Sequence, residues 1–215
     1  MYDKSTTQSV RTDLLSALGR IGVRRVFARN KEIYSEDDPA ASWFIVLSGT
    51  VRICKLLVGG RRHIAEFCYP GDCFGLDRVT QRLYSAEAVG DVVVMRYAHK
   101  ATELLINDEP HLAQALYAMT LRGLANAQTR ILVLGAMRAP ERVARFLVEF
   151  SERREDCDVL EVPMSRNDIA DYLGLTVETV CRVLSSFKSD GVIALSGPHR
   201  IELRSPDTLA ALCET

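Results

Sequence analysis

The chain has 215 residues, of which 47% are hydrophobic and 26% are charged, and its formal net charge is −1. This composition suits one or two globular domains, and the charge balance excludes a global electrostatic attraction to nucleic acid. No apolar run approaches the roughly 20 residues of a membrane span, and the polar N-terminus lacks the apolar core of a signal peptide. We therefore expect a cytoplasmic protein with no membrane contact.

The N-terminal half of the chain reads as a short helix followed by many short strands. The entry helix is predicted over residues 11–22, and the strand pattern runs from Val23 to about Tyr97. Strands are predicted at residues 44–47, 51–55, 63–69 and 92–97, with turns at Ser48-Gly49, Gly59-Gly60 and Pro70-Gly71-Asp72. Short strands with regular Gly and Pro punctuation indicate a β-roll or jelly roll.

A jelly roll can house a metal, so a cupin-type metalloenzyme is an alternative of a different class. It would need two or three His ligands and a carboxylate that converge inside the barrel. His63 and Glu66 lie three residues apart, which places them on opposite faces of a strand, and His99 is the other His of this region. We therefore predict no catalytic residue, no metal site and no cofactor.

A long helix is predicted over residues 102–137. Along it, apolar residues recur at alternating spacings of three and four, which is typical of a coiled-coil seam. The seam residues are Tyr117, Thr120, Leu124, Ala127, Ile131 and Leu134. A second set, expected to pack on the chain's own β-roll, comprises Leu116, Met119, Leu132 and Val133. One helix with two apolar faces predicts that one face packs on the chain's own β-roll and that the other packs on a second copy of the chain in a homodimer.

Ala139-Pro140 marks a hinge followed by a new helix over residues 141–150. Proline disfavours a helical residue before it and fits the first turn of a helix. The new helix carries its apolar residues on one face, at Val143, Phe146, Leu147 and Phe150. We divide the chain into a β-roll domain with its entry helix (1–101), a dimerisation helix (102–138) and a C-terminal DNA-binding domain (139–215).

Residues 165–188 are the most informative stretch of the sequence. Ser165, followed three residues later by Asp168, predicts a capping box that opens a helix. Gly174 ends this helix, because so tight a turn favours a residue that tolerates positive φ. Thr176 is a good N-cap for the helix that follows.

The second helix of this stretch presents polar residues from its first turns. Glu178, Cys181 and Arg182 are spaced at i, i+3 and i+4, so they share one outward face. Two short helices joined by a glycine turn, the second with an exposed polar face, describe a helix-turn-helix that reads DNA. An ordinary helical hairpin with a solvated face is the alternative.

A predicted β-hairpin follows, with strands at residues 192–195 and 201–204. A short strand is also expected at residues 159–163, before the helix-turn-helix. A hairpin directly after a recognition helix is a wing, and His199 and Arg200 at its tip are placed to meet a phosphate. The C-terminal domain is thus predicted to be a winged helix-turn-helix in an α+β chain.

The run ETVCRVLSSFKSDGVI closely resembles the winged helix-turn-helix of the cyclic-AMP-receptor/oxygen-regulator superfamily of bacterial transcription factors. The segment from Glu178 to Arg182 is most similar to the branch that controls nitrogen-fixation and microaerobic genes. WFIVLSGTVRI and YPGDCFG resemble the corresponding pieces of the cyclic-nucleotide-binding fold. The resemblance is specific in the helix-turn-helix and extends more loosely over nearly the whole chain.

This resemblance implies a dimer that binds double-stranded DNA at a TTGA-N6-TCAA-like palindrome and activates transcription by contacting RNA polymerase. It assigns base readout to Glu178 and Arg182. An Arg guanidinium can bond O6 and N7 of guanine together, and a Glu carboxylate can accept from N4 of cytosine. Candidates for phosphate contact are Ser165, Thr179 and His199.

Family members that bind a cyclic nucleotide hold the ribose with a Gly-Glu pair and the phosphate with an Arg-Ser pair. The first pair corresponds to Gly75-Leu76 or nearby here, and the second falls at Tyr84-Ser85. Arg82 is shifted by two positions, which on a strand returns it to the same face. Since burying a phosphate without a cation is costly, we expect no cyclic nucleotide. A regulator that uses the β-roll pocket for another ligand is the alternative.

Six cysteines, at residues 54, 68, 73, 157, 181 and 213, include no CxxC pair, so reduced thiols are expected. Iron–sulfur sensors of the superfamily carry a cysteine cluster near the N-terminus, whereas Cys54 is the first cysteine here, so no cluster is expected. Cys181 stands where most of the oxygen-regulator branch has Ser. The positive helix end and Arg182 favour its thiolate, while Glu178 opposes it. We predict a redox-sensitive off switch at Cys181; a simple stand-in for Ser is the alternative.

Overall fold

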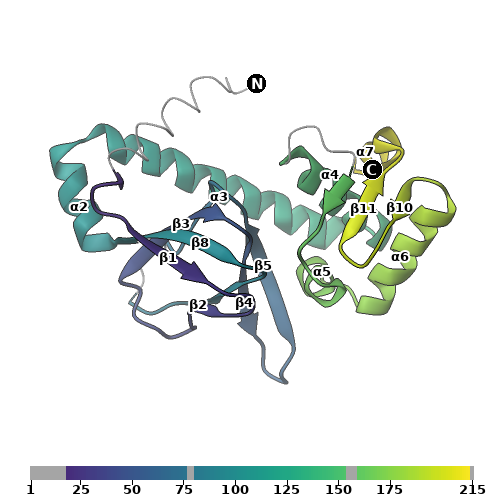
Figure 1. The fold of residues 1–215 in the computed structure, drawn as a ribbon, viewed down its shortest axis with the longest axis horizontal. Coiled ribbons are helices and arrows are strands. Elements are labelled where there is room, and N and C mark those ends of the chain that lie inside the picture. The colour runs from purple at the N-terminus through teal and green to yellow at the C-terminus, as the bar shows by residue number, and fades with distance from the viewer. Residues whose placement is uncertain (1–17, 77–79, 154–158, 214–215) are drawn as a thin grey trace. The chain divides into compact units, whose positions relative to one another are not determined.

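The computed structural model of the protein describes residues 18–76, 80–153 and 159–213 (Figure 1). These residues form two compact units. One unit holds the described residues up to Lys55 together with Glu66–Ala127, and the other holds Leu56–Ala65 and the described residues from Gln128 onward. The predicted α+β class is confirmed. Most of the entry helix predicted at residues 11–22 lies outside the described residues, and Leu18 near its end is buried.

Within the described residues, the β-roll consists of two four-stranded sheets. One sheet has the order β1 (Val23–Phe27), β8 (Val92–Ala98), β3 (Ser42–Ser48) and β6 (Cys73–Phe74). The other has the order β2 (Glu32–Tyr34), β7 (Ser85–Ala88), β4 (Val51–Leu56) and β5 (Arg62–Cys68). The predicted strands are confirmed, with ends that differ by one or two residues. The tip of the β4–β5 hairpin, Leu56–Ala65, groups with the second unit.

The core of the β-roll explains why β3 is buried without interruption from Ser42 to Val46. On the inner face of the roll, Phe44 stacks on Phe74 with ring centroids 5.0 Å apart. On the other face, Trp43 stacks on Tyr97 at 4.5 Å in a second cluster. A strand that is covered on both faces loses the alternation of apolar and polar residues and reads as a continuous apolar run.

The glycine turn between β3 and β4 is fixed by space as well as by backbone angle. Gly49 has φ of 84°, and a Cβ atom there would lie 2.3 Å from the carbonyl oxygen of Asp91. Only glycine fits such a position without a shift of the neighbouring backbone. The predicted turn at Ser48-Gly49 is confirmed.

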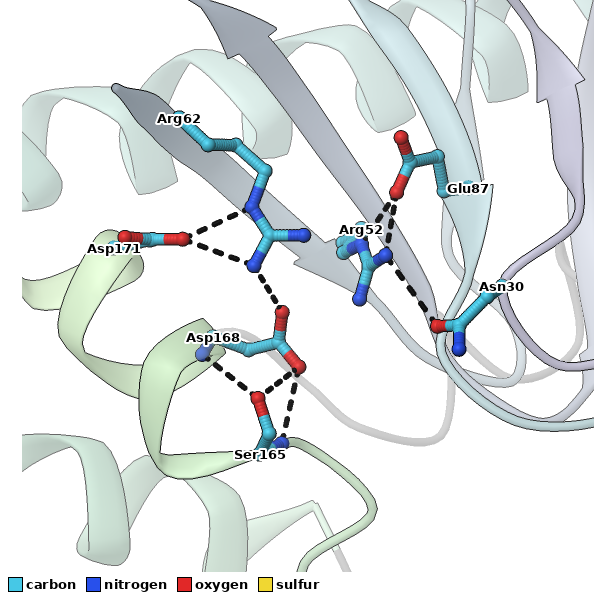
Figure 2. Close-up of polar contacts among 7 residues, drawn as sticks. All are labelled: Asn30, Arg52, Arg62, Glu87, Ser165, Asp168 and Asp171. Atoms are coloured by element: carbon cyan, nitrogen blue, oxygen red, sulfur yellow. Dashed lines mark hydrogen bonds and ion pairs between the residues drawn. The ribbon is translucent and has the colours of Figure 1, made fainter. Parts of the chain in front are cut away.

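One buried cation, Arg52, forms an ion pair with a carboxylate within the second sheet. Arg52 on β4 lies opposite Glu87 on β7 in the strand register, and its Nε donates to Glu87 Oε2 at 2.7 Å (Figure 2). Arg52 is only 7% exposed, so its charge needs this partner. The Arg52 guanidinium therefore pairs within the β-roll and is not available to bind a ligand.

The helical segment after the β-roll is broken once, which the sequence analysis missed. The structure has α2 (His99–Asp108) and α3 (His111–Ala136) where one helix over residues 102–137 was predicted. Glu109 has φ of −130° and ψ of 79°, because the following Pro110 disfavours a helical residue before it. Leu112 and Ala115 of α3 are buried in the cluster of Trp43 and Tyr97.

No helix in the described part of the chain is long and apolar enough to cross a membrane.

The second unit begins its DNA-binding part with α4 (Ala139–Glu152), as predicted from Pro140. The predicted apolar face is buried, at Val143, Phe146, Leu147 and Phe150. Arg142 of α4 ties together the ends of other helices. Its guanidinium donates to the carbonyl oxygens of Leu134, Met137 and Leu173 at 2.8, 2.9 and 3.0 Å. These carbonyls lie at or just past helix ends, where no intrahelical donor is available. The last described helix is α7 (Pro206–Cys213).

Candidate DNA-reading surface

The first helix of the helix-turn-helix, α5 (Arg166–Leu173), begins with the predicted capping box. The Asp168 N–H donates to Ser165 Oγ at 3.1 Å, and the Ser165 N–H donates to Asp168 Oδ2 at 3.0 Å. The Ser165 hydroxyl also donates to Asp168 Oδ2, at 2.7 Å (Figure 2). Both donors of Ser165 are therefore engaged within the box. A phosphate at this end of α5 would meet the first-turn N–H groups, which have no acceptor inside the helix.

The turn and the start of α6 (Val177–Ser189) also follow the sequence prediction. Gly174 adopts the left-handed conformation, with φ of 62° and ψ of 35°. Thr176 caps α6, since its Oγ1 accepts a hydrogen bond from the Thr179 N–H at 3.2 Å. The inner side of α6 is buried, at Val180, Val183, Leu184 and Phe187. The apolar spacing therefore orients α6 as predicted.

The opposite side of α6 is the reading face, which we define as Glu178, Cys181 and Arg182. All three side chains are exposed, so the predicted outward face is confirmed. Arg182 Nη2 lies 3.4 Å from Thr179 Oγ1, and Thr179 Oγ1 lies 3.1 Å from the hydroxyl of Thr176. This chain of hydroxyls draws the Arg182 guanidinium toward the N-terminal end of the helix. Glu178 lies one helical turn before Arg182 on the same face of α6.

The environment of Glu178 keeps its carboxylate ionised. Its own backbone N–H and the side chain of Thr176 donate hydrogen bonds that lower the pKa of Glu178, with a smaller opposing effect of desolvation. An ionised carboxylate can only accept hydrogen bonds. Glu178 therefore suits a donor such as the exocyclic amine of cytosine, and Arg182 beside it suits the acceptors of guanine.

Arg166, the first residue of α5, is a cation near the reading face that the sequence analysis missed. Its Nη1 is buried and has no hydrogen-bond partner among the described residues. Burial lowers the pKa of Arg166, and the side chain of Cys181 acts in the opposite direction. The two residues belong to different helices, α5 and α6. No local sequence pattern joins two residues so far apart in the chain.

The wing is confirmed beside α6 (Figure 1). Its three-stranded sheet has the order β10 (Ile193–Leu195), β11 (Arg200–Leu203) and β9 (Val159–Glu161). His199 is tied to the strand end, because its Nδ1 lies 2.9 Å from the carbonyl oxygen of Val162. If Nδ1 donates this bond, Nε2 of a neutral ring can only accept. A phosphate contact by His199 thus requires the doubly protonated ring, whereas Arg200 is exposed and always charged.

The apolar face of α3 is wider than the predicted seam. Tyr117, Leu124 and Ile131 are exposed by 65%, 56% and 71% in the single chain. Thr120 donates its hydroxyl to the carbonyl oxygen of Leu116, which satisfies the hydroxyl within the helix. Leu132 was predicted to pack on the chain's own β-roll, but it is 68% exposed. The prediction for Leu132 is wrong, whereas Leu116 and Met119 pack in the β-roll cluster as predicted. Val133 is buried, but it is not part of that cluster.

Leu132 lies on the same side of α3 as Leu121, because eleven residues make about three helical turns. Leu121 is 46% exposed, so this side of α3 faces solvent in the single chain. The apolar residues that α3 exposes are therefore Tyr117, Leu121, Leu124, Ile131 and Leu132. We call this set the α3 stripe. Such a continuous exposed stripe on one helix is typical of a surface that another chain covers.

The cysteines differ in accessibility. Cys54 and Cys68 are buried in the β-roll. Burial, with the charges of Asp72 and Glu66, raises the pKa of Cys73 to about 11. Cys181 is exposed on the reading face, and Cys157 lies outside the described residues. Among the described residues, no three His, Cys, Asp or Glu side chains gather in a way that could hold a metal ion. The cupin-type alternative thus has no ligand set there.

Arg82, the cation nearest the expected nucleotide site, is turned into the β-roll. It is 3% exposed, and its Nη1 donates to the carbonyl oxygen of Gly75 at 3.0 Å. Its Nη2 donates to the carbonyl oxygen of Ser42, and its guanidinium lies 4.3 Å from the ring centre of Tyr34. Tyr84 is 38% exposed. The guanidinium is thus bound to backbone carbonyls and an aromatic ring instead of facing an open phosphate site.

Comparison with known proteins identifies the family. A Crp-like helix-turn-helix domain matches residues 141–212, and a cyclic nucleotide-binding domain matches residues 24–109. The nitrogen fixation regulation protein FixK of Azorhizobium caulinodans is 41% identical over 197 residues, which cover 89% of this chain and 79% of that protein. The chain belongs to the FixK branch of the Crp/Fnr family. FixK of Rhizobium meliloti is 36% identical over 208 residues, which cover 96% of this chain and 95% of that one.

The fold of this Crp/Fnr protein agrees with that of a solved relative. The structure of FixK2 from Bradyrhizobium japonicum superposes with a TM-score of 0.85 at 40% identity, over 89% of this chain and 97% of that chain. The Crp/Fnr family consists of transcription regulators, so the winged helix-turn-helix is the DNA-binding domain of this one. The resemblance predicted from residues 165–188 is confirmed.

Proposed function

We propose that this Crp/Fnr regulator binds a TTGA-N6-TCAA-like palindrome as a homodimer and activates transcription through contact with RNA polymerase. The observation that carries the proposal is the reading face of α6, where Glu178 and Arg182 are exposed one helical turn apart. One G·C pair in each half-site can satisfy both residues. Because DNA is its ligand, the protein acts in the cytoplasm. The names of the FixK relatives, nitrogen fixation regulation proteins, support a role in the control of nitrogen-fixation genes.

Footprinting on synthetic palindromes tests this function. Purified, reduced protein is expected to protect both half-sites of TTGA-N6-TCAA, because two recognition helices enter successive major grooves about one turn apart. Adding about five base pairs between the half-sites turns one of them to the opposite side of the duplex and should abolish joint protection. A scrambled sequence of the same length is the control. Equal protection of the original and the lengthened palindrome would contradict the proposal.

Dimerisation through the α3 stripe is part of the same proposal. Ile131→Glu is expected to raise the dimer dissociation constant at least about tenfold, because it places a carboxylate without a partner in an apolar contact. Asn126→Glu is the matched control, since it adds the same charge to an exposed α3 position outside the stripe. Sedimentation at micromolar concentration measures both variants. A wild-type protein that is monomeric until cyclic AMP is added would contradict this prediction.

The regulator is proposed to work without a cyclic nucleotide or an iron–sulfur cluster. The buried contacts of Arg82 with Gly75, Ser42 and Tyr34 support the first part, since a phosphate would have to replace them. The positions of the cysteines support the second part. Cys54 and Cys68 are buried in the strand core, and the thiol of Cys73 stays protonated at neutral pH. Control would then act through synthesis, turnover or modification of the chain.

Oxidation of Cys181 is the modification that we propose as an off switch. The exposed sulfur lies on the reading face, beside Arg182 in the sequence and three residues after Glu178. Peroxide would oxidise the thiolate to a sulfenic acid with release of hydroxide, and a second equivalent would give the sulfinic acid. A sulfinate adds a negative charge where the surface meets DNA phosphates. A glutathione adduct at the same sulfur would block the groove by its bulk.

A further inference from the structure

The tip of the β4–β5 hairpin supplies a cation to the DNA-binding unit. Arg62 lies in the segment Leu56–Ala65 that groups with this unit. Its Nε donates to Asp171 Oδ2 at 2.9 Å, and its Nη2 lies 2.6 Å from Asp168 Oδ1 and 2.9 Å from Asp171 Oδ2 (Figure 2). Both carboxylates belong to α5. One guanidinium therefore joins two acids that lie one turn apart on the same helix.

The two carboxylate oxygens of Asp168 accept hydrogen bonds from different partners. Oδ2 closes the capping box with Ser165, and Oδ1 bonds Arg62. The Asp168 side chain is only 6% exposed, and a carboxylate so deeply buried is unfavourable unless a charge partner and hydrogen bonds satisfy it. Arg62 provides that charge. Burial opposes the charged guanidinium, but the hydrogen bond with Asp171 and the charge of Asp168 outweigh it and raise the pKa of Arg62.

We propose that Arg62 is a positioning residue for DNA binding. It fixes the first turn of α5, whose N–H groups face the phosphate backbone, and it neutralises carboxylates that would repel that backbone. The inference rests on the proposed DNA-binding function and adds a residue from outside the helix-turn-helix to it. Phosphate contacts set affinity and register, whereas base contacts set sequence preference. Loss of Arg62 should therefore weaken binding to every sequence by the same factor.

The matched pair Arg62→Gln and Arg61→Gln tests the proposal in the full-length dimer. Both variants remove one positive charge from neighbouring positions, but among these two only Arg62 contacts the α5 carboxylates. Arg62→Gln is expected to raise Kd about tenfold, because it removes charge-assisted hydrogen bonds from a buried acid. The increase should be equal for the palindrome and for a palindrome with its G·C pairs replaced. Arg61→Gln should change Kd by less than about twofold.

Two further readouts separate positioning from stability alone. Titration at stoichiometric DNA gives the active fraction, so a purely structural role would lower this fraction and leave the Kd of active protein unchanged. Hydrogen exchange at residues 165–169 needs no DNA and should be faster in Arg62→Gln than in Arg61→Gln. If the wild-type protein does not bind the palindrome, the proposed function is wrong. The hydrogen-exchange rates at residues 165–169 then still decide whether Arg62 stabilises the first turn of α5.

A charge exchange identifies the partner. Arg62→Asp is expected to bind DNA more weakly than Arg62→Gln. Combining it with Asp171→Arg should recover most of the affinity, because an Arg at position 171 reaches both position 62 and Asp168 one turn away. Arg62→Lys, which keeps the charge but loses the forked geometry, should fall between wild type and Arg62→Gln. Equal Kd values and equal exchange rates for Arg62→Gln and Arg61→Gln, or no recovery in the double variant, would overturn the inference.

Discussion

Arg182→Ala is expected to cost about 1–3 kcal/mol of binding free energy in each half-site and to relax the preference for guanine at the contacted position. The exposed guanidinium on the reading face is free to bond O6 and N7 of one guanine together, and alanine leaves both acceptors unpaired. Because the dimer reads two half-sites, the total loss should be about 2–6 kcal/mol. Glu178→Ala should relax the preference at the partner cytosine in the same way.

Selection of binding sites from random DNA measures this prediction. Arg145→Ala is a suitable control, because it also removes one cation but lies on α4, outside the reading face, in a half-buried pair with Glu149. Its selected site should equal that of wild type. If the Glu178→Ala and Arg182→Ala proteins also select the wild-type site, the assignment of base readout is wrong.

Peroxide is expected to weaken DNA binding of the wild-type protein at least about tenfold, since placing like charges side by side at an interface costs several kcal/mol. A sulfinate at Cys181 would repel phosphates. It would also attract Arg182, the next residue of the reading face, and so draw the Arg182 guanidinium away from its base. The Cys181→Ser protein keeps a small polar group at this position and should retain its affinity after the same treatment.

One control makes the oxidation experiment specific. Cys213→Ser removes another cysteine of the same unit and should leave the peroxide response unchanged. A Cys181→Ser protein that loses binding to peroxide as readily as wild type would refute the switch at this residue.

The sequence was most informative where local chemistry decides the structure. The capping box of Ser165 and Asp168, the left-handed Gly174 and the cap at Thr176 depend on residues within a few positions of each other, so α5 and α6 could be placed before the structure was known. The reading face followed from helical spacing alone. The break before α3 was also local, and Pro110 is the signal that the prediction of one long helix ignored.

The parts that could not be predicted depend on contacts between distant segments. The periodicity of apolar residues places Leu132 on an apolar part of α3. It does not show which of the two apolar faces of the helix packs on the β-roll. Arg82 was expected on a strand, but it precedes β7 (Ser85–Ala88), and its guanidinium turns inward to the carbonyl oxygens of Gly75 and Ser42. The bonds of Arg62 to Asp168 and Asp171 join different elements, and nothing in the local sequence indicates them.

The hairpin segment Leu56–Ala65 has a consequence for modular exchange of DNA-binding domains. A fragment that starts at the hinge near Ala139 contains the whole helix-turn-helix but lacks Arg62, so the buried carboxylate of Asp168 would lose its charge partner. Such a fragment should be less stable than its own hydrophobic core suggests. A chimera made by joining this domain to the β-roll of another regulator inherits the same defect, unless the donor hairpin carries a basic residue at the equivalent position.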